Sequence, residues 1–474
     1  MPSQSAMFTG GSSLRDRFQA RFHGYVDHAS LFKKRFERRL QGNRDSDEVE
    51  LETAKCRQHV WAPREKTDFS ATTIQRHLRS GFYEHPTRGE GRFRAKYRIP
   101  TSVYMELKAE LVALDPLLDP KNSRSKRRDN LVPIDNKLLT VLRILGRGMI
   151  VQDDLDHSGM SPDMIRKTFK KVTGLMSRHL FDKYVHLPKD DEQMARCMQM
   201  YTDVGLSGAF GSMDATHVPW DNCPAVLRNA HVGKEGFPTL THNCVVSNDL
   251  YFMAVTRSKP GSFNDKTLVR FDSASERLRN GEFAHVKFTL HDKDGRAVLH
   301  ADPYLVVDGG YHRWTHLLCG YGRAADEQEA AYTARLTSVR KDVECAFGVL
   351  KQRFRILKTP VQFRSAAAID AIFRCCVVLH NRILVADGRR FLGHSRQMAL
   401  PAEAGATWGS HQSMVGLSIR RPERPSLYVS SETDVTSVGR WVEEPEEPEA
   451  DADFESRRSA VKVHFWYCKY TRGV

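Results

Sequence analysis

Apolar residues at helical spacing are clearest between Ile134 and Met176. Ile165, Phe169, Val172 and Met176 follow one another at spacings of 4, 3 and 4, which is the pattern of one buried helix face. Directly before them stand a serine, a proline and an aspartate at 161–163, which are typical of a helix start. The pattern predicts three helices over this stretch, the last of them beginning at Pro162.

After residue 205 the period changes from helical to strand-like. β-branched and aromatic residues between turn signals predict strands over 209–218, 240–247, 251–256 and 304–307. A Lys-Asp-Gly sequence at 293–295 predicts a hairpin turn. Helical spacing returns over 339–354 and 367–383, and strands followed by helices predict an α/β core.

These changes divide the chain into four parts. Residues 1–99 are basic and poorly patterned, although 18–40 and 72–83 are candidate basic helices. Residues 100–190 read as a helical domain and residues 200–388 as the α/β domain. Residues 389–474 contain the acidic stretch EEPEEPEADADFE and are predicted to be a solvated, disordered tail.

Composition narrows the class of protein. The 474 residues carry a net charge of +14, and this excess of Lys and Arg makes a polyanionic partner plausible because phosphate binding releases counterions. No apolar run approaches the ~18 residues of a membrane span, and the first residues lack a secretory signal. The nine scattered cysteines include no C-x-x-C pair, which favours a reducing compartment over a zinc ribbon or a disulfide framework.

Basic residues gather at two places. The linker at 121–130 reads equally as a solvated loop and as a nuclear-import or phosphate-contact segment. The helix from Pro162 follows a short helix and a tight turn, as in a helix-turn-helix, and its outer face carries Arg166, Lys167, Lys170 and Lys171. A plain helical bundle with a charged solvent face explains the same residues.

Three acids interrupt apolar surroundings. Asp214 lies within a predicted strand, Asp308 directly follows one, and Glu344 lies on the amphipathic helix at 339–354. Carboxylates in such settings are compensated well by Mg²⁺ or Mn²⁺, and two such ions support phosphodiester hydrolysis. Taken singly, the same acids read as a strand-end residue, a turn former and an ion-pair partner of Arg340.

Four sequence blocks, taken together, favour metal binding by these acids over three separate structural roles. The blocks are G-S-M-D-A-T-H-V-P-W-D-N-C-P at 211–224, K-P-G-S-F-N-D at 259–265, V-V-D-G-G-Y at 306–311 and R-K-D-V-E-C-A-F-G-V-L-K-Q-R-F at 340–354. This arrangement resembles Harbinger-type transposases and the host nucleases derived from them. The last two acids are 36 positions apart, as in compact Asp-Asp-Glu transposases.

The resemblance implies a ribonuclease H-like core, a mixed sheet flanked by helices, preceded by the helix-turn-helix domain. Asp214 would lie on its first strand, Asp308 just beyond its fourth and Glu344 on a late helix, all three meeting at two Mg²⁺ or Mn²⁺ ions. The implied activity is DNA cleavage by water, with strand transfer in a full transposase. The implied partners are DNA and a Myb-like DNA-binding protein that helps nuclear entry. Association with further copies of the chain and a nuclear location, with the cytoplasm as a second location, are further expectations.

Three further residues are supporting candidates. His217 either assists the site or satisfies a nearby backbone group. Asp265 reads first as a helix cap, a role that Asn264 could fill instead, and second as a metal contact. Arg340 either contacts a scissile-strand phosphate or orients Glu344. Two other functions remain open: a domesticated, non-catalytic DNA-binding or chromatin-associated protein, and a metal-dependent hydrolase of small phosphates.

Overall fold

The structure is a computed structural model that describes residues 68–85, 88–122, 132–149, 154–359, 363–388 and 450–472. The candidate helix at 18–40, most of the basic linker and residues 389–449 of the predicted tail lie outside these residues. All described residues belong to one unit, Asp68–Val474.

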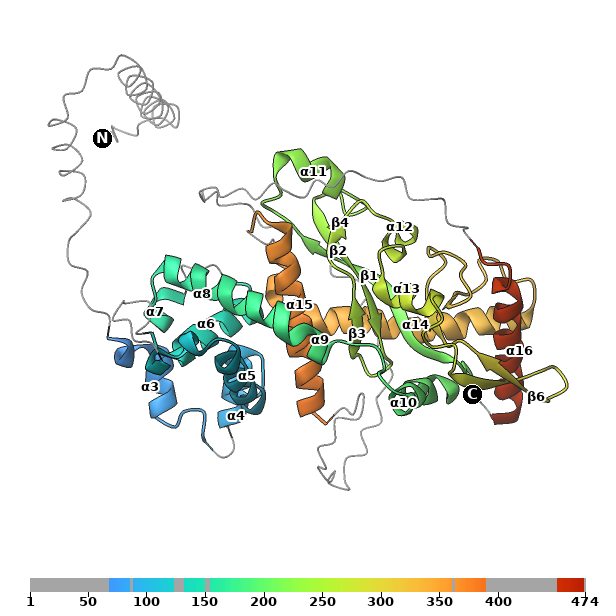
Figure 1. Ribbon diagram of the computed structural model, residues 1–474, viewed down its shortest axis with the longest axis horizontal. Helices are drawn as coiled ribbons and strands as arrows, with labels where there is room; N and C mark the ends of the chain where they lie inside the picture. Colours follow the sequence, from blue (N-terminus) through green and yellow to red (C-terminus); the bar gives the residue numbers. More distant parts are fainter. Residues whose placement is uncertain are drawn as a thin grey trace, which may run out of the picture. The chain divides into compact units, whose positions relative to one another are not determined.

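The first half of the described chain is helical (Figure 1). One core cluster joins buried side chains from α3 through α8, among them Ile74, Phe93 and Tyr97. The described helices therefore begin near residue 68. α3 lies within the candidate helix at 72–83, whereas α4, which was not predicted, is short and basic and shows no apolar period. The helices of this region are α3 (Thr73–Arg79), α4 (Gly89–Tyr97), α5 (Thr101–Leu114), α6 (Ile134–Arg147), α7 (Leu155–Ser158), α8 (Pro162–Leu175), the π-helical turn Met176–Leu180, α9 (Phe181–Tyr184) and α10 (Asp191–Thr202).

The three helices predicted over 134–176 are α6, α7 and α8. Gly148 ends α6 with φ = 64°, a left-handed conformation that glycine adopts without strain. Ser161 caps α8 by accepting a hydrogen bond from the Met164 backbone N–H at 3.4 Å. The predicted stripe on α8 is buried throughout, whereas its four basic residues are exposed.

The second half contains a mixed sheet, so the α/β class is confirmed. Its strands follow the order β3-β2-β1-β7-β8, with β1, β2 and β3 antiparallel and β7 and β8 parallel to β1. Each predicted strand is present within a few residues of its predicted ends. The strands are β1 (Ala209–Pro219), β2 (Thr239–Val246), β3 (Phe252–Val255), β7 (Tyr304–Val306) and β8 (Leu317–Leu318), with β4 (Lys259–Pro260) paired to β2.

Shorter elements connect these strands. The predicted hairpin is β5 (Lys287–His291) with β6 (Ala297–Ala301), and Gly295 in its turn has φ = +77°. The helices α11 (Ala225–His231), α12 (Asp265–Val269) and α13 (Ser273–Arg279) lie between β1 and this hairpin in the chain.

Two long helices follow the sheet. α14 (Glu327–Arg353) crosses β1, β2 and β7, and its second half shares a core with Cys244 and Val246 of β2 (Figure 1). α15 (Ala366–Ala386) packs against α5, α8, α9 and β3, so it joins the helical region to the sheet. No described helix is long and apolar enough to cross a membrane.

The end of the chain differs from the prediction. Residues 454–472 form helix α16 (Phe454–Arg472) instead of continuing a disordered tail. Phe454, Val461 and Phe465 are buried in a core shared with α14 and β5. Sequence patterning missed this helix because its apolar face is short, interrupted by polar residues and preceded by the acidic stretch.

Candidate active site

Two of the predicted acids lie close together on neighbouring segments: Asp214 is on β1, and Asp308 comes two residues after the adjacent parallel strand β7. β1 pairs with β7 so that Ser212 is opposite Val306, and Asp214 and Asp308 each come two residues later. These equal offsets bring the two carboxylates close enough for the Asp308 charge to act on Asp214. Burial raises the pKa of Asp214 to about 6, and the charges of Asp308 and Asp265 act in the same direction.

Asp265 joins this pair from α12. Helix capping falls to Asn264, whose side chain accepts a hydrogen bond from the Thr267 N–H at 2.8 Å. A Cβ at Gly310 would lie 2.9 Å from Asp265 Oδ2 and 3.0 Å from Asp308 Oδ1, so both carboxylates border this glycine. Burial and then the Asp308 charge raise the pKa of Asp265. Gly310 therefore leaves the room in which the two acids approach each other.

Arg340 links these strand acids to Glu344. Its Nη1 lies 2.8 Å from Asp214 Oδ2, and its Nη2 lies 2.8 Å from Glu344 Oε1. The side chains of Asp214 and Arg340 are each 19% exposed, whereas that of Glu344 is 50% exposed. The three predicted catalytic acids thus share one neighbourhood, with a guanidinium between the strand and the helix.

The donor chemistry suits Mg²⁺ or Mn²⁺, but the arrangement does not form a finished ion site. Carboxylate oxygens are the ligands that these ions prefer, and Asp214, Asp265 and Asp308 supply them. Within the described part of the chain, however, no three ligating side chains are placed to hold one metal ion. Glu344 is separated from Asp214 by Arg340, so the complete predicted ligand set of Asp214, Asp308 and Glu344 does not converge on a single point.

His217 lies on the opposite face of β1 from Asp214. Its Nδ1 lies 2.9 Å from Thr239 Oγ1 and 3.0 Å from Thr241 Oγ1 on β2. Burial lowers the pKa of His217 to about 4, so the ring is neutral at pH 7. It ties β1 to β2 and does not contact the acids, because three positions along a strand reverse the direction of a side chain.

Sequence reasoning missed a buried network beneath Asp308. Tyr311 donates to Asn243 Oδ1 at 2.7 Å, and the Asn243 amide donates to Asp272 Oδ2 at 3.1 Å. Asp272 also caps α13 through the Ser275 N–H at 2.9 Å. The network fixes the chain directly after Asp308, and its only sequence signals were the tyrosine of V-V-D-G-G-Y and an aspartate before a helix.

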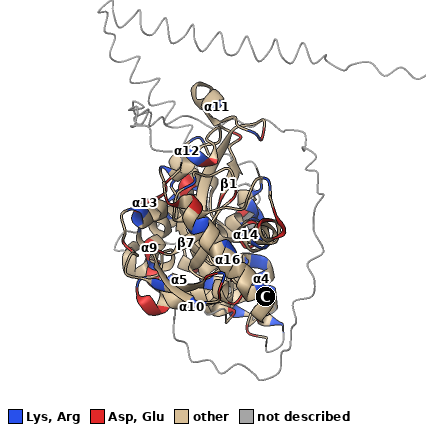
Figure 2. Cartoon of the chain, turned by 90° about the vertical axis from the view of Figure 1, so that its right-hand side faces the viewer, with Lys and Arg blue, Asp and Glu red and all other residues tan. Residues whose placement is uncertain are grey.

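The basic residues predicted to bind DNA are exposed on α8. Arg166 lies 2.8 Å from Asp163, and Lys171 lies 2.5 Å from Asp115. Lys167 and Lys170 are exposed as well. Figure 2, which views the chain from the side of α16, shows Lys and Arg interspersed with Asp and Glu along the cartoon.

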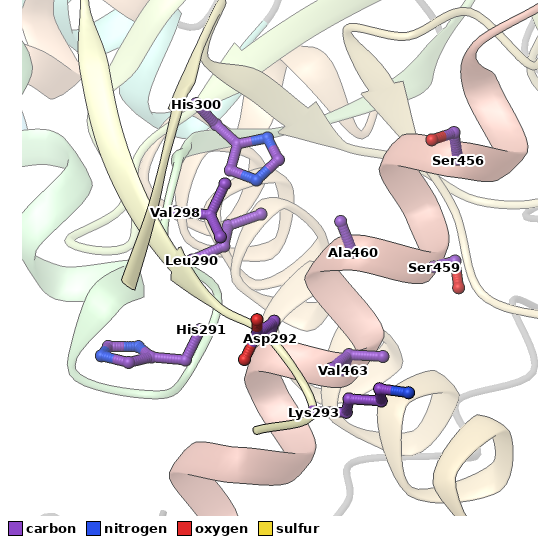
Figure 3. A pocket seen from close by; sticks show the side chains of 10 residues that line it. All are labelled: Leu290, His291, Asp292, Lys293, Val298, His300, Ser456, Ser459, Ala460 and Val463. Atoms are coloured by element: carbon purple, nitrogen blue, oxygen red, sulfur yellow. The ribbon is translucent and has the colours of Figure 1, made fainter. Parts of the chain in front are cut away.

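A cavity of about 400 Å³ lies between the β5–β6 hairpin and α16 (Figure 3). Its wall includes Leu290, Val298, Ala460 and Val463, with His291 and His300 at its hairpin side. None of the predicted catalytic acids lines it. The cavity is therefore a feature separate from the acid cluster.

Comparison with known proteins bears on the same region. A family model described as "Plant transposon protein" matches residues 182–391, which include β1 to α15 and all four sequence blocks. A relative described as "Protein ALP1-like", from Arabidopsis thaliana, is 24% identical over 280 residues, or 58% of this chain and 66% of the relative. No solved structure matches significantly. The resemblance to Harbinger-type transposases and their derived nucleases is confirmed, and the chain spans just under two thirds of its relative.

Proposed function

Taking residues 182–391 as a member of the plant transposon protein family, of Harbinger type, we propose that this protein is a metal-dependent DNA endonuclease of transposase descent. The observation that carries the proposal is the placement of Asp214 on β1 and of Asp308 just after the neighbouring parallel strand β7, with Glu344 linked to Asp214 through Arg340. The alternative of a non-catalytic DNA-binding protein requires no such placement.

The sheet supports a ribonuclease H-like assignment for the core. Leaving out the short β4 and the β5–β6 hairpin, Asp214 lies on the first strand, Asp308 follows the fourth, and Glu344 lies on the long helix after them. These are the positions that the resemblance implies. The helices α6, α7 and α8 likewise support a helix-turn-helix whose exposed basic face contacts DNA.

The acids have distinct tasks in this proposal. Asp214, Asp308 and Glu344 would hold two Mg²⁺ or Mn²⁺ ions, which would supply Lewis-acid chemistry at the scissile phosphate. Asp265 adds negative charge beside Asp308, and the Tyr311–Asn243–Asp272 network keeps the Asp308 segment in place. A Myb-like partner, self-association and a nuclear location, with some protein in the cytoplasm, belong to the same proposal.

Cleavage of duplex DNA by the full chain with Mg²⁺ tests the proposal. We expect Asp214→Asn, Asp308→Asn and Glu344→Gln each to lower the cleavage rate by about three orders of magnitude, as for residues that act as one unit. Glu276→Gln, an acid-to-amide change at an exposed position of α13, is the matched control and keeps the wild-type rate. Equal rates in the wild type and in all four variants would remove the mechanism.

A further inference from the structure

Arg340 occupies the position where the proposed metal ligands should come together. It lies one helical turn before Glu344 on α14, and its guanidinium reaches across to β1. Its Nη1 donates a hydrogen bond to Asp214 Oδ2 at 2.8 Å, and its Nη2 forms an ion pair with Glu344 Oε1 at 2.8 Å. A guanidinium presents its donors in a planar fork, so one arginine can hold two carboxylates at once.

This position excludes a shared divalent cation. An ion bound by Asp214 and Glu344 would have to lie within about 2.1 Å of an oxygen of each, where the guanidinium N–H groups now contact both carboxylates. Two positive groups so close repel each other strongly in a partly buried site. Arg340 must therefore leave at least one of its partners before the ion can bind.

The surroundings indicate where the guanidinium can go. Glu344 is half-exposed, so the helix side of the bridge faces solvent, whereas Asp214 lies at the buried end. A DNA phosphate arriving from the open side offers the same paired oxygen acceptors that Glu344 offers now. Arginine exchanges readily between carboxylate and phosphate partners because both fit its fork.

We propose that Arg340 is an internal counter-ion that keeps the gap between Asp214 and Glu344 closed to divalent cations until a DNA phosphate draws it away. The inference rests on the proposed function, because it takes these two acids as metal ligands. DNA and the divalent cation then bind with positive coupling, and by linkage each tightens the binding of the other by the same factor. Free protein would hold the cation weakly and would not expose a loaded site.

Binding of Mn²⁺ to the full chain without DNA, followed by the electron paramagnetic resonance signal of free Mn²⁺, tests this inference. We expect Arg340→Ala to bind Mn²⁺ about tenfold more tightly than the wild type, because the acids lose their competing cation. Arg340→Lys should lie between the two, since an ammonium group is a point charge without the fork. Asp214→Asn should bind Mn²⁺ most weakly.

Lys341→Ala is the matched control. Lys341 is exposed on the same helix, one residue away, so its removal changes the net charge equally without opening the bridge. We expect its Mn²⁺ affinity to change by less than about twofold, because exposed charges are screened. Thermal unfolding of each variant establishes that it is folded. If Arg340→Ala is not folded, the comparison of Arg340→Lys with the wild type is the test.

A second measurement addresses the coupling to DNA. Fluorescence anisotropy of a labelled duplex with EDTA or with Ca²⁺, another oxygen-seeking cation, should show about tenfold tighter DNA binding with Ca²⁺ for the wild type. In Arg340→Ala that enhancement should be lost. An enhancement of equal size in both proteins would overturn the coupling.

The two proposals fail in different ways. Equal Mn²⁺ affinities in the wild type and Arg340→Ala overturn the counter-ion role, and DNA cleavage by the wild type would then leave the nuclease function standing. Tighter Mn²⁺ binding by Arg340→Ala together with no cleavage by any protein would support the counter-ion role and end the nuclease proposal. Absence of Mn²⁺ binding in Arg340→Ala also overturns the counter-ion role.

Discussion

Glu110 in the helical region and Asp214 in the sheet are both partly buried acids that contact an arginine, yet their surroundings differ. Burial alone would raise the pKa of Glu110, but hydrogen bonds from Lys183, Tyr184 and Arg382 lower it below its ordinary value. Asp214 accepts hydrogen bonds from the Ala215 N–H and from Arg340, and both lower its pKa. Burial and the charges of two neighbouring carboxylates raise it by more, so the pKa of Asp214 is about 6.

The difference separates an acid whose donors outweigh its burial from one, assigned to the site by the proposed function, whose donors do not. Glu110 lies on α5 and Arg382 on α15, so their pair fastens the helical region to the helix that covers the sheet. Asp214 belongs to a group of acids with more negative charge than the surrounding donors neutralise. An acid short of partners lowers stability, and functional sites are where proteins tolerate such a loss.

Removing the charge of Glu110 should have the largest effect on stability. Glu110→Gln leaves the Arg382 side chain, which is only 3% exposed, with an incomplete set of partners. We expect the free energy of unfolding to fall by about 3 kcal/mol, as for other buried pairs that lose one member. Urea denaturation measures the change. Glu192→Gln, which breaks the exposed pair with Arg196, should change stability by less than about 1 kcal/mol.

Removing the charge of Asp214 should raise the free energy of unfolding, in contrast to the loss expected at Glu110. The folded pKa of Asp214, about 6, lies above its ordinary 3.8, so the folded state binds the proton more tightly and stability falls as pH rises from about 4 to 6. Asp214→Asn removes this loss and should raise the free energy of unfolding by about 2 kcal/mol at pH 7 without divalent cations. The gain should disappear near pH 4. Asp221→Asn, at an exposed position after β1, should show neither effect.

His157 in the helical region should give a smaller pH dependence of stability, of the opposite direction to that of Asp214. Burial lowers the pKa of His157 from 6.5 to about 3, so the unfolded state gains the proton first and stability falls as pH drops below 6.5. Between pH 7.5 and 5.5 this group should remove about 1.4 kcal/mol of stability from the wild type. His157→Gln should lack that loss, whereas His179→Gln, at an exposed position, should retain it. A wild-type slope unchanged by His157→Gln would contradict the assignment.

Local patterns predicted most of the elements but not all of their limits. The stripe on α8, its Ser161 cap and the turn at Gly295 depend on residues a few positions apart, and each is present where expected. α4 and α16 were missed because each contributes only a few apolar side chains to a core built by distant segments, whereas α3 lies within the candidate helix at 72–83. Tertiary packing outweighs propensity for such helices.

In the candidate site, too, local patterns predicted some features and tertiary packing decided the others. Asp214, Asp308 and Glu344 were identified from their sequence blocks, and pairing of β1 with β7 places the first two together. The order of Asn264 and Asp265 left both as candidate caps, and only the structure assigns the cap to Asn264 and directs Asp265 toward Gly310. His217 shares a block with Asp214, yet strand alternation turns it to the other face.

The sequence by itself determined the order of helices and strands and the positions of the acids, because hydrophobic period, turn residues and caps act over a few neighbouring residues. The tertiary structure decided which acids meet and what lies between them. Asp214 and Arg340 are 126 positions apart, and their contact depends on how α14 crosses the sheet. No local pattern contains that information, since it arises from burying the apolar face of one element against another.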